Sequence, residues 1–346
     1  MTQRHNGLYI DPMAPSHLFV RSSAVTLAVL LLFSYLPKAR AAEWKDPSSH
    51  IVRFIEVEPG VKLEVLDWGG SGEPVLLLSG HGDTGHIFDD FAPRLAHHGF
   101  HVYAITRRGF GASSQPEQGY DLARMVEDIA RVTEALKLKR VNLVGHSIAG
   151  DEMTRFVLTY PEKVEKLVYL EAAYDRVEAQ RLEARFPKLP PSPPAIKRSE
   201  TPESIRSSVA QAEILMPEAE IRATRVFGPN GQFVRPVTPD RIVHAVAIMV
   251  EHPDYKLIHA PIFAIYAVYE TPAQLLPRYN SADRETRQVL DQIFDIWQPF
   301  AKGQRDLLRK SVPQARVDEI HGASHYVFIS HQERVLQEMA AFLQTP

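Results

Sequence analysis

The stretch VNLVGHSIAGD, residues 141–151, decides the fold. Its first part, Val141 to Val144, is a short run of strand formers, apolar except for Asn142, and its last part begins a helix. Small residues lie on both sides of Ser147, as a sharp strand-to-helix turn requires, because the backbone of the serine itself is strained there. Such a turn lifts the hydroxyl away from the sheet, in front of the free N–H groups of the helix N-terminus. The pattern predicts a serine nucleophile at position 147.

Short apolar runs of the same kind recur along the chain and alternate with amphipathic helices. Residues 51–67 have the pattern of a hairpin that turns at Pro59-Gly60. Further strands are predicted at 75–78, 101–105, 141–144, 166–170, 262–268 and 316–320. Between them, apolar residues spaced by three and four predict helices that cover a sheet: Leu122, Met125, Ile129, Val132 and Leu136. Ser330 with Glu333 predicts a capping box before a last helix.

This alternation predicts an α/β protein with a doubly wound, mostly parallel sheet that is covered on both faces. We expect the first part of the core at 42–173 and the second part at 261–346. The segment between them, 174–260, has no clear strand, and its Pro-rich stretch 188–197 leads into short helical patterns. We interpret it as an inserted helical lid.

Residues 1–41 have the pattern of a secretory signal peptide. Arg21 precedes an apolar run at 24–36, and the small-residue site Ala39-Arg40-Ala41 follows it. The run is shorter than the about 20 residues that a membrane-spanning helix needs. We therefore expect export to the periplasm or the medium and no membrane span in the mature form; an uncleaved anchor is the alternative. Met1 and Met13 are both candidate start residues.

The composition excludes several other classes of function. The 346 residues carry a formal net charge of −3, which favours neither nucleic acid nor an anionic membrane surface as a partner. The chain contains no cysteine, so disulfides, thiolate metal sites, iron–sulfur clusters and a cysteine nucleophile are excluded. The sequence does not indicate an oligomeric state.

On these motifs the chain resembles the α/β-hydrolases, and the resemblance covers most of residues 51–343. The second glycine of the family's nucleophile motif is Ala149 here, which is still small enough for close packing of helix against strand. The family's catalytic base follows the last strand, which implies His325 in EIHGASHYVF. His321, four residues earlier, lacks the helix and the third ligand of a zinc motif, so we expect neither a metal nor a cofactor.

The acid that orients the histidine has three candidates. Glu270 ends the strand FAIYAVYE, the commoner position in the family. Glu171 follows the strand in LVYLEAAYD, an arrangement similar to that of one haloalkane dehalogenase group. The tract before Glu270 lacks the glycine turn that usually frees the acid, whereas Glu171 directly precedes Ala172-Ala173. We favour Glu171, with Glu270 and then Asp175 as alternatives.

The resemblance also implies an oxyanion hole formed by two backbone N–H groups. One belongs to Ile148, the residue after the nucleophile, and the other to His81 in the loop LLLSGHGDTGH. The stretch ITRRGFGASSQP, 105–116, resembles the family too. It contains two glycines but not the third that a dinucleotide-binding fingerprint requires, so it does not indicate a dinucleotide site.

Together these features imply a serine hydrolase that cleaves a small carboxylic ester, or a related acyl substrate, through an acyl-enzyme on Ser147. Relatives that act on haloalkanes or epoxides have an aspartate at that position. A cofactor-free perhydrolase or a C–C hydrolase with the same triad, and a non-catalytic ligand-binding protein, are the alternatives. Aromatic residues in and beside the lid predict a small-molecule substrate with an apolar moiety: Phe227, Phe233, Tyr266, Tyr269 and Trp297.

Overall fold

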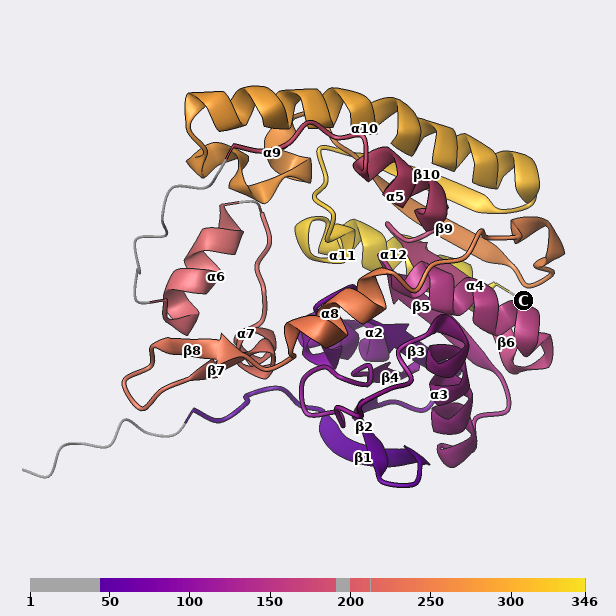
Figure 1. Cartoon of the computed structure of the whole chain (residues 1–346). Helices are drawn as coiled ribbons and strands as arrows, with labels where there is room; N and C mark the ends of the chain where they lie inside the picture. The colour runs from indigo at the N-terminus through magenta and orange to yellow at the C-terminus, as the bar shows by residue number, and fades with distance from the viewer. Residues whose placement is uncertain (1–43, 191–199, 212, 346) are drawn as a thin grey trace, which may run out of the picture. The chain divides into compact units, whose positions relative to one another are not determined.

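An eight-stranded sheet forms the centre of the protein in the computed structural model, which describes residues 44–190, 200–211 and 213–345 (Figure 1). The strand order is β1-β2-β4-β3-β5-β6-β9-β10. The first two pairings, β1 with β2 and β2 with β4, are antiparallel, and all the others are parallel. The strands are β1 (Ile51–Glu58), β2 (Val61–Gly69), β3 (Pro74–Leu78), β4 (His101–Ile105), β5 (Val141–His146), β6 (Val164–Leu170), β9 (Ile262–Val268) and β10 (Arg316–His321).

The apolar runs form these strands because both faces of the sheet are buried, so continuous hydrophobic stretches are stable there. One buried cluster joins the sheet to α3 (Leu122–Ala135), α4 (Ala149–Thr159) and part of α10 (Arg284–Ser311). The other face packs against η2 (Gly85–Phe88), α2 (Ala92–His97), α11 (Val327–Ser330) and α12 (Gln332–Gln344). Pro47–Pro346 form one compact unit. The predicted fold class is therefore confirmed.

The segment between β6 and β9 contains mostly short helices (Figure 1). They are α5 (Arg176–Glu183), α6 (Pro202–Ala210), α7 (Glu218–Thr224), α8 (Asp240–Ala247) and η4 (Tyr255–Leu257). It also holds a small hairpin, β7 (Arg225–Phe227) with β8 (Phe233–Pro236), where no strand was predicted. That this segment acts as a lid stays a prediction, as do its boundaries.

One further prediction is wrong, and another cannot be compared with the structure. The capping box predicted at Ser330 is wrong: α12 has His331 as its N-cap without a side-chain cap, and the Ser330 hydroxyl accepts the Ser324 N–H at 3.2 Å. The short elements between β9 and α10, α9 (Pro272–Leu275) and η5 (Pro277–Ser281), and η3 (Pro161–Lys163) complete the chain. The proposed signal peptide lies outside the described residues.

In the part of the chain that the structure describes, no helix combines the length and apolar character that a membrane crossing needs.

Candidate active site

Ser147 lies at the tight turn between β5 and α4. Its φ is +56°, in the left-handed region that non-glycine residues rarely adopt. A side chain at Gly145 would come within 2.2 Å of the Met153 sulfur, and one at Gly150 within 1.9 Å of the Ala172 carbonyl oxygen. The Ala172 carbonyl is backbone and cannot move aside easily, so position 150 needs glycine, whereas the Met153 side chain beside Gly145 is flexible. The structure has the turn that the motif predicted.

His325 follows β10, and its Nδ1 lies 3.1 Å from Oε2 of Glu171, which directly follows β6. The Glu171 side chain is 1% exposed, whereas that of His325 is 38% exposed and reaches the cavity. Three more donors hold the carboxylate: the hydroxyls of Tyr174 at 2.8 Å and Tyr269 at 2.6 Å, and the N–H of Ala267 at 2.8 Å. A carboxylate held in this way can orient one tautomer of the imidazole and stabilise the imidazolium.

The other candidate acids lie elsewhere. Glu270 is exposed, and its carboxylate is 3.6 Å from Nδ1 of His321, whereas the carboxylate that contacts His325 is that of Glu171. Asp175 caps α5 and lies 2.8 Å from His252. The geometry therefore favours Glu171 over the two alternatives, and its catalytic role stays a prediction.

Ser147, His325 and Glu171 line one cavity of about 850 Å³. Its wall comes from β-strand ends, from α5 and α8, and from α9 and α10. Most of the wall is apolar, with Ile214, Ile248, Leu275, Ile293 and Trp297 among its residues. Of the aromatic residues predicted to define the substrate, Tyr269 and Trp297 line this cavity.

The remaining three aromatic residues have structural contacts instead. Tyr266 is buried, and its hydroxyl donates to the Ala173 carbonyl at 2.8 Å. Phe227 and Phe233 pack edge to face in the hairpin of β7 and β8, with ring centroids 6.5 Å apart. Aromatic content alone therefore did not distinguish cavity residues from packing residues.

The predicted oxyanion donors flank the serine. Ile148 is the N-cap of α4, so its N–H is one of the groups that a helix start leaves without an intrahelical partner. His81 also lines the cavity, and its Nε2 donates to the Val243 carbonyl in α8 at 2.9 Å. Burial lowers the pKa of the His81 side chain, which keeps the imidazole neutral near neutral pH. The side chain thus ties the loop to α8, while the backbone N–H is the predicted donor.

Arg107 braces the loop that carries His81, a role that the sequence analysis did not foresee. Its guanidinium donates to the carbonyls of Ser79 at 3.0 Å and Gly80 at 3.2 Å. It also forms a bidentate salt bridge with Glu152 in α4, at 2.6 and 2.8 Å. Both charged side chains are buried. Arg107 therefore connects the two elements that present the predicted oxyanion donors. The sequence around Arg107 resembles the family, but the pairing of Arg107 with Glu152, 45 positions away, leaves no local pattern in the sequence.

The side chain of His146 is hydrogen-bonded to the backbone of His325. Its Nε2 donates to the His325 carbonyl at 3.0 Å, and the two rings are 4.6 Å apart. Burial lowers the pKa of His146 well below its ordinary value, and the nearby His325 lowers it further. A neutral His146 places no fixed positive charge beside the predicted base.

A mostly parallel sheet, a strained serine before a helix, and a histidine paired with a buried glutamate together have the arrangement of an α/β-hydrolase fold. Residues 73–196 match the family described as the alpha/beta hydrolase fold. A non-heme chloroperoxidase of Streptomyces lividans is 34% identical over 120 residues, which are 34% of this chain and 44% of that protein. A serine hydrolase-like protein of Homo sapiens is 37% identical over 119 residues, 34% of this chain and 58% of that protein. The chain thus spans about half the length of these relatives, 44% and 58%.

The similarity in three dimensions is more extensive. The crystal structure of E-2-(acetamidomethylene)succinate hydrolase superposes with a TM-score of 0.61 at 21% identity, and the match covers 86% of this chain and 100% of that one. At this identity the superposition establishes the fold. The chain therefore has the α/β-hydrolase fold, and its residues 73–196 match the family of that name.

Proposed function

We propose that this protein is a serine hydrolase that cleaves small carboxylic esters, with an apolar group on the acyl or the alcohol side. The observation that supports the proposal most strongly is the contact of 3.1 Å between His325 and the buried Glu171, in the same cavity that Ser147 lines from its strained turn. The apolar wall of that cavity suits an apolar moiety.

In the proposed mechanism, His325 takes the proton of the Ser147 hydroxyl as the oxygen attacks the ester carbonyl. The N–H groups of His81 and Ile148 donate to the oxyanion of the tetrahedral intermediate. His325 then gives its proton to the leaving alcohol, and the acyl-enzyme forms. Water attacks this ester with His325 as the base, which releases the carboxylic acid and restores the serine. Glu171 holds the imidazole in position through its contact with Nδ1.

A panel of p-nitrophenyl esters from acetate to laurate tests the proposal. We expect saturable hydrolysis with a preference along the acyl series, and a loss of about 10³-fold or more in kcat for Ser147→Ala. Ser208→Ala, on the exposed side of α6, is the matched control and should retain the wild-type rate. The proposal fails if Ser147→Ala keeps more than about a tenth of the wild-type activity, since triad serines contribute far more.

Perhydrolysis is a second candidate, because the chain is similar to a non-heme chloroperoxidase. In that reaction hydrogen peroxide instead of water attacks the acyl-enzyme, and a peracid leaves. Ester hydrolysis measured with and without peroxide separates the two: a perhydrolase produces peracid in preference to acid, whereas a hydrolase forms the acid at an unchanged rate.

We also propose that the protein is exported, on the strength of the apolar run at 24–36 and the small-residue site that follows it. Cell fractionation with antibody detection tests this: export predicts a shortened chain in the periplasm or medium. A full-length chain in the membrane fraction would instead support the uncleaved anchor.

A further inference from the structure

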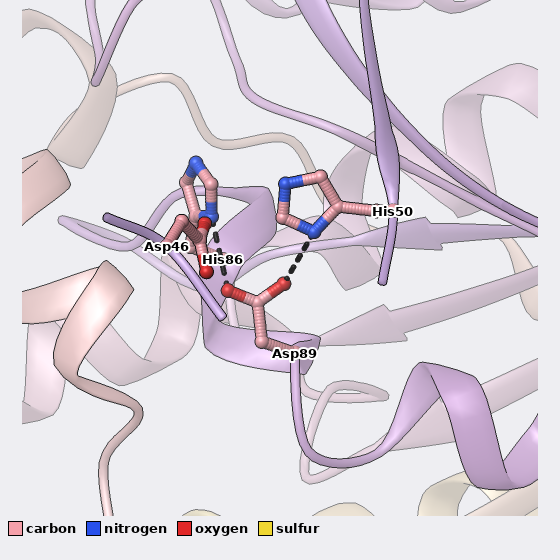
Figure 2. A group of neighbouring side chains, drawn as sticks. All are labelled: Asp46, His50, His86 and Asp89. Carbon is pink, nitrogen blue, oxygen red and sulfur yellow. Dashed lines mark hydrogen bonds and ion pairs between the residues drawn. The ribbon is translucent and has the colours of Figure 1, made fainter. Parts of the chain in front are cut away.

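Three side chains converge at a place apart from the catalytic cavity. His50 directly precedes β1, His86 lies within η2, and Asp89 directly follows η2. The carboxylate of Asp89 lies between the two rings (Figure 2): Oδ1 is 3.0 Å from Nδ1 of His50, and Oδ2 is 3.0 Å from Nδ1 of His86. The ligand atoms that the three residues offer all lie within 4.8 Å of one another.

The side chains of His50, His86 and Asp89 are buried and packed against their neighbours. The side chains of His50 and Asp89 are 3% and 2% exposed, and that of His86 is 11% exposed. The Trp68 ring packs edge-on against His50 with centroids 5.3 Å apart. Two imidazoles and a carboxylate in a rigid, nearly dry environment are a ligand set that zinc prefers.

A second layer of contacts orients His86. Its Nε2, the nitrogen that faces away from Asp89, lies 3.6 Å from Oε1 of Glu64. Glu64 in turn accepts the hydroxyl of Thr106 at 2.7 Å, and that hydroxyl accepts the N–H of Gly85 at 2.9 Å. Histidines that bind a metal commonly direct the other ring nitrogen to a carboxylate in this way, which fixes the tautomer.

We propose that Nδ1 of His50, Nδ1 of His86 and one oxygen of Asp89 bind a zinc ion, with a solvent oxygen or another protein oxygen as the fourth ligand. Ligand atoms about 2.0–2.1 Å from a tetrahedral zinc are about 3.3 Å apart. Whichever Asp89 oxygen binds the ion, its separation of 3.0 Å from the nearer Nδ1 is within a few tenths of an ångström of the spacing that the ion requires.

The competing account is an ionic network without a metal. Burial alone would lower the pKa of His86, but its hydrogen bonds to Asp89 and Glu64 raise it to about 10. In that account His86 carries a proton that the two carboxylates neutralise. The two accounts differ in what occupies the space between the nitrogens and Asp89, so direct metal binding distinguishes them.

A zinc ion here would have a structural role. It would connect the residue before β1 to η2, which begins just after the loop that carries His81. Thr84 caps η2 through its hydroxyl, which accepts the His86 N–H at 3.2 Å, and its own N–H donates to Glu220 in α7 at 3.1 Å. We expect the ion to stabilise this end of the sheet and to take no part in the chemistry at Ser147.

The test uses the full chain, stripped of metal with a chelator and titrated with Zn²⁺ by calorimetry, or with Co²⁺ by visible absorption. We expect one equivalent to bind, a rise in melting temperature, and the intense absorption of tetrahedral cobalt. Asp89→Asn and His50→Gln should each weaken binding by about 10-fold or more, because each removes a ligand. If Asp89→Asn does not fold, His50→Gln alone gives the answer.

Two variants serve as controls. His252→Gln removes a histidine that also faces a carboxylate, Asp175 at 2.8 Å, but on the surface, and should leave binding unchanged. His325→Ala, which removes the histidine of the catalytic cavity, should do the same. Absence of binding by the wild-type chain, or binding that survives both Asp89→Asn and His50→Gln, would overturn the proposal and leave the ionic network as the explanation.

Discussion

Replacement of Glu171 by glutamine tests the predicted triad acid with little change in side-chain shape. Glu171 receives four donors at 2.6–3.1 Å, and a carboxylate can accept all of them. A glutamine offers one oxygen and an NH₂ group. If the NH₂ group replaces Oε2, both Tyr269 and His325 face another donor. The imidazole would then lose both its preferred tautomer and the negative charge that stabilises the imidazolium.

We expect Glu171→Gln to lower kcat for p-nitrophenyl acetate by about 10³–10⁴-fold, with a small change in KM. That loss corresponds to about 4–5.5 kcal/mol of transition-state stabilisation. The unpaired donor should also cost about 1–3 kcal/mol of folding stability. At about 2–4 °C per kcal/mol, the melting temperature should fall by several degrees.

Glu270→Gln is the matched control, because Glu270 is exposed and pairs only with His321 among the described residues. A surface change of this kind should alter kcat by about twofold at most. Steady-state kinetics on both variants, with circular dichroism to confirm folding, completes the comparison. Equal and small losses in the two variants would refute the assignment, and a larger loss in Glu270→Gln would reverse it.

Three further predictions follow from the packing around the site. Arg107→Lys should lower kcat about 10–100-fold with KM nearly unchanged, because lysine cannot hold the loop of His81 and α4 at once; an equal change in kcat and KM in steady-state kinetics would contradict this. Gly150→Ala should lower stability by about 1–3 kcal/mol or more in a denaturant titration, since its Cβ would meet a carbonyl oxygen at 1.9 Å. Gly303→Ala, within α10 and with nothing within 4 Å, should not destabilise. Burial raises the pKa of Asp151 to about 8, so the contribution of this side chain to folding stability is present at low pH and lost as the pH rises toward and through about 8. The variant Asp151→Asn should therefore have a higher melting temperature than the wild type near pH 9 and not near pH 5. Equal differences in melting temperature at both pH values would contradict the pKa shift.

The sequence predicted the strands well because the physical cause is local. A strand buried on both faces favours an apolar run, and Ile262 to Val268 is such a run; Val141 to Val144 is apolar except for Asn142. The turn at Ser147 was equally predictable, since the close packing of α4 against the backbone of Ala172 leaves no room for a side chain at position 150.

The contacts that pair distant charged residues could not be predicted in the same way. Arg107 with Glu152, and Asp89 with two histidines, depend on which strand ends and loops become neighbours, and the intervening residues carry no periodic signal. The capping box predicted at Ser330 is wrong for another reason: the Ser330 hydroxyl accepts the N–H of Ser324, six residues earlier in the loop of His325, instead of capping α12. The choice between Glu171 and Glu270 likewise needed the direction in which each strand end turns.

The most direct test of the central claim is the mass of the protein after reaction with a fluorophosphonate, followed by peptide mapping. If the Ser147 hydroxyl and the His325 imidazole act together in the cavity, the wild type gains one phosphonyl group on the peptide that contains Ser147. Ser147→Ala should gain none, and His325→Ala should react slower by orders of magnitude. An unmodified wild-type protein, or a label on another residue, would contradict the account.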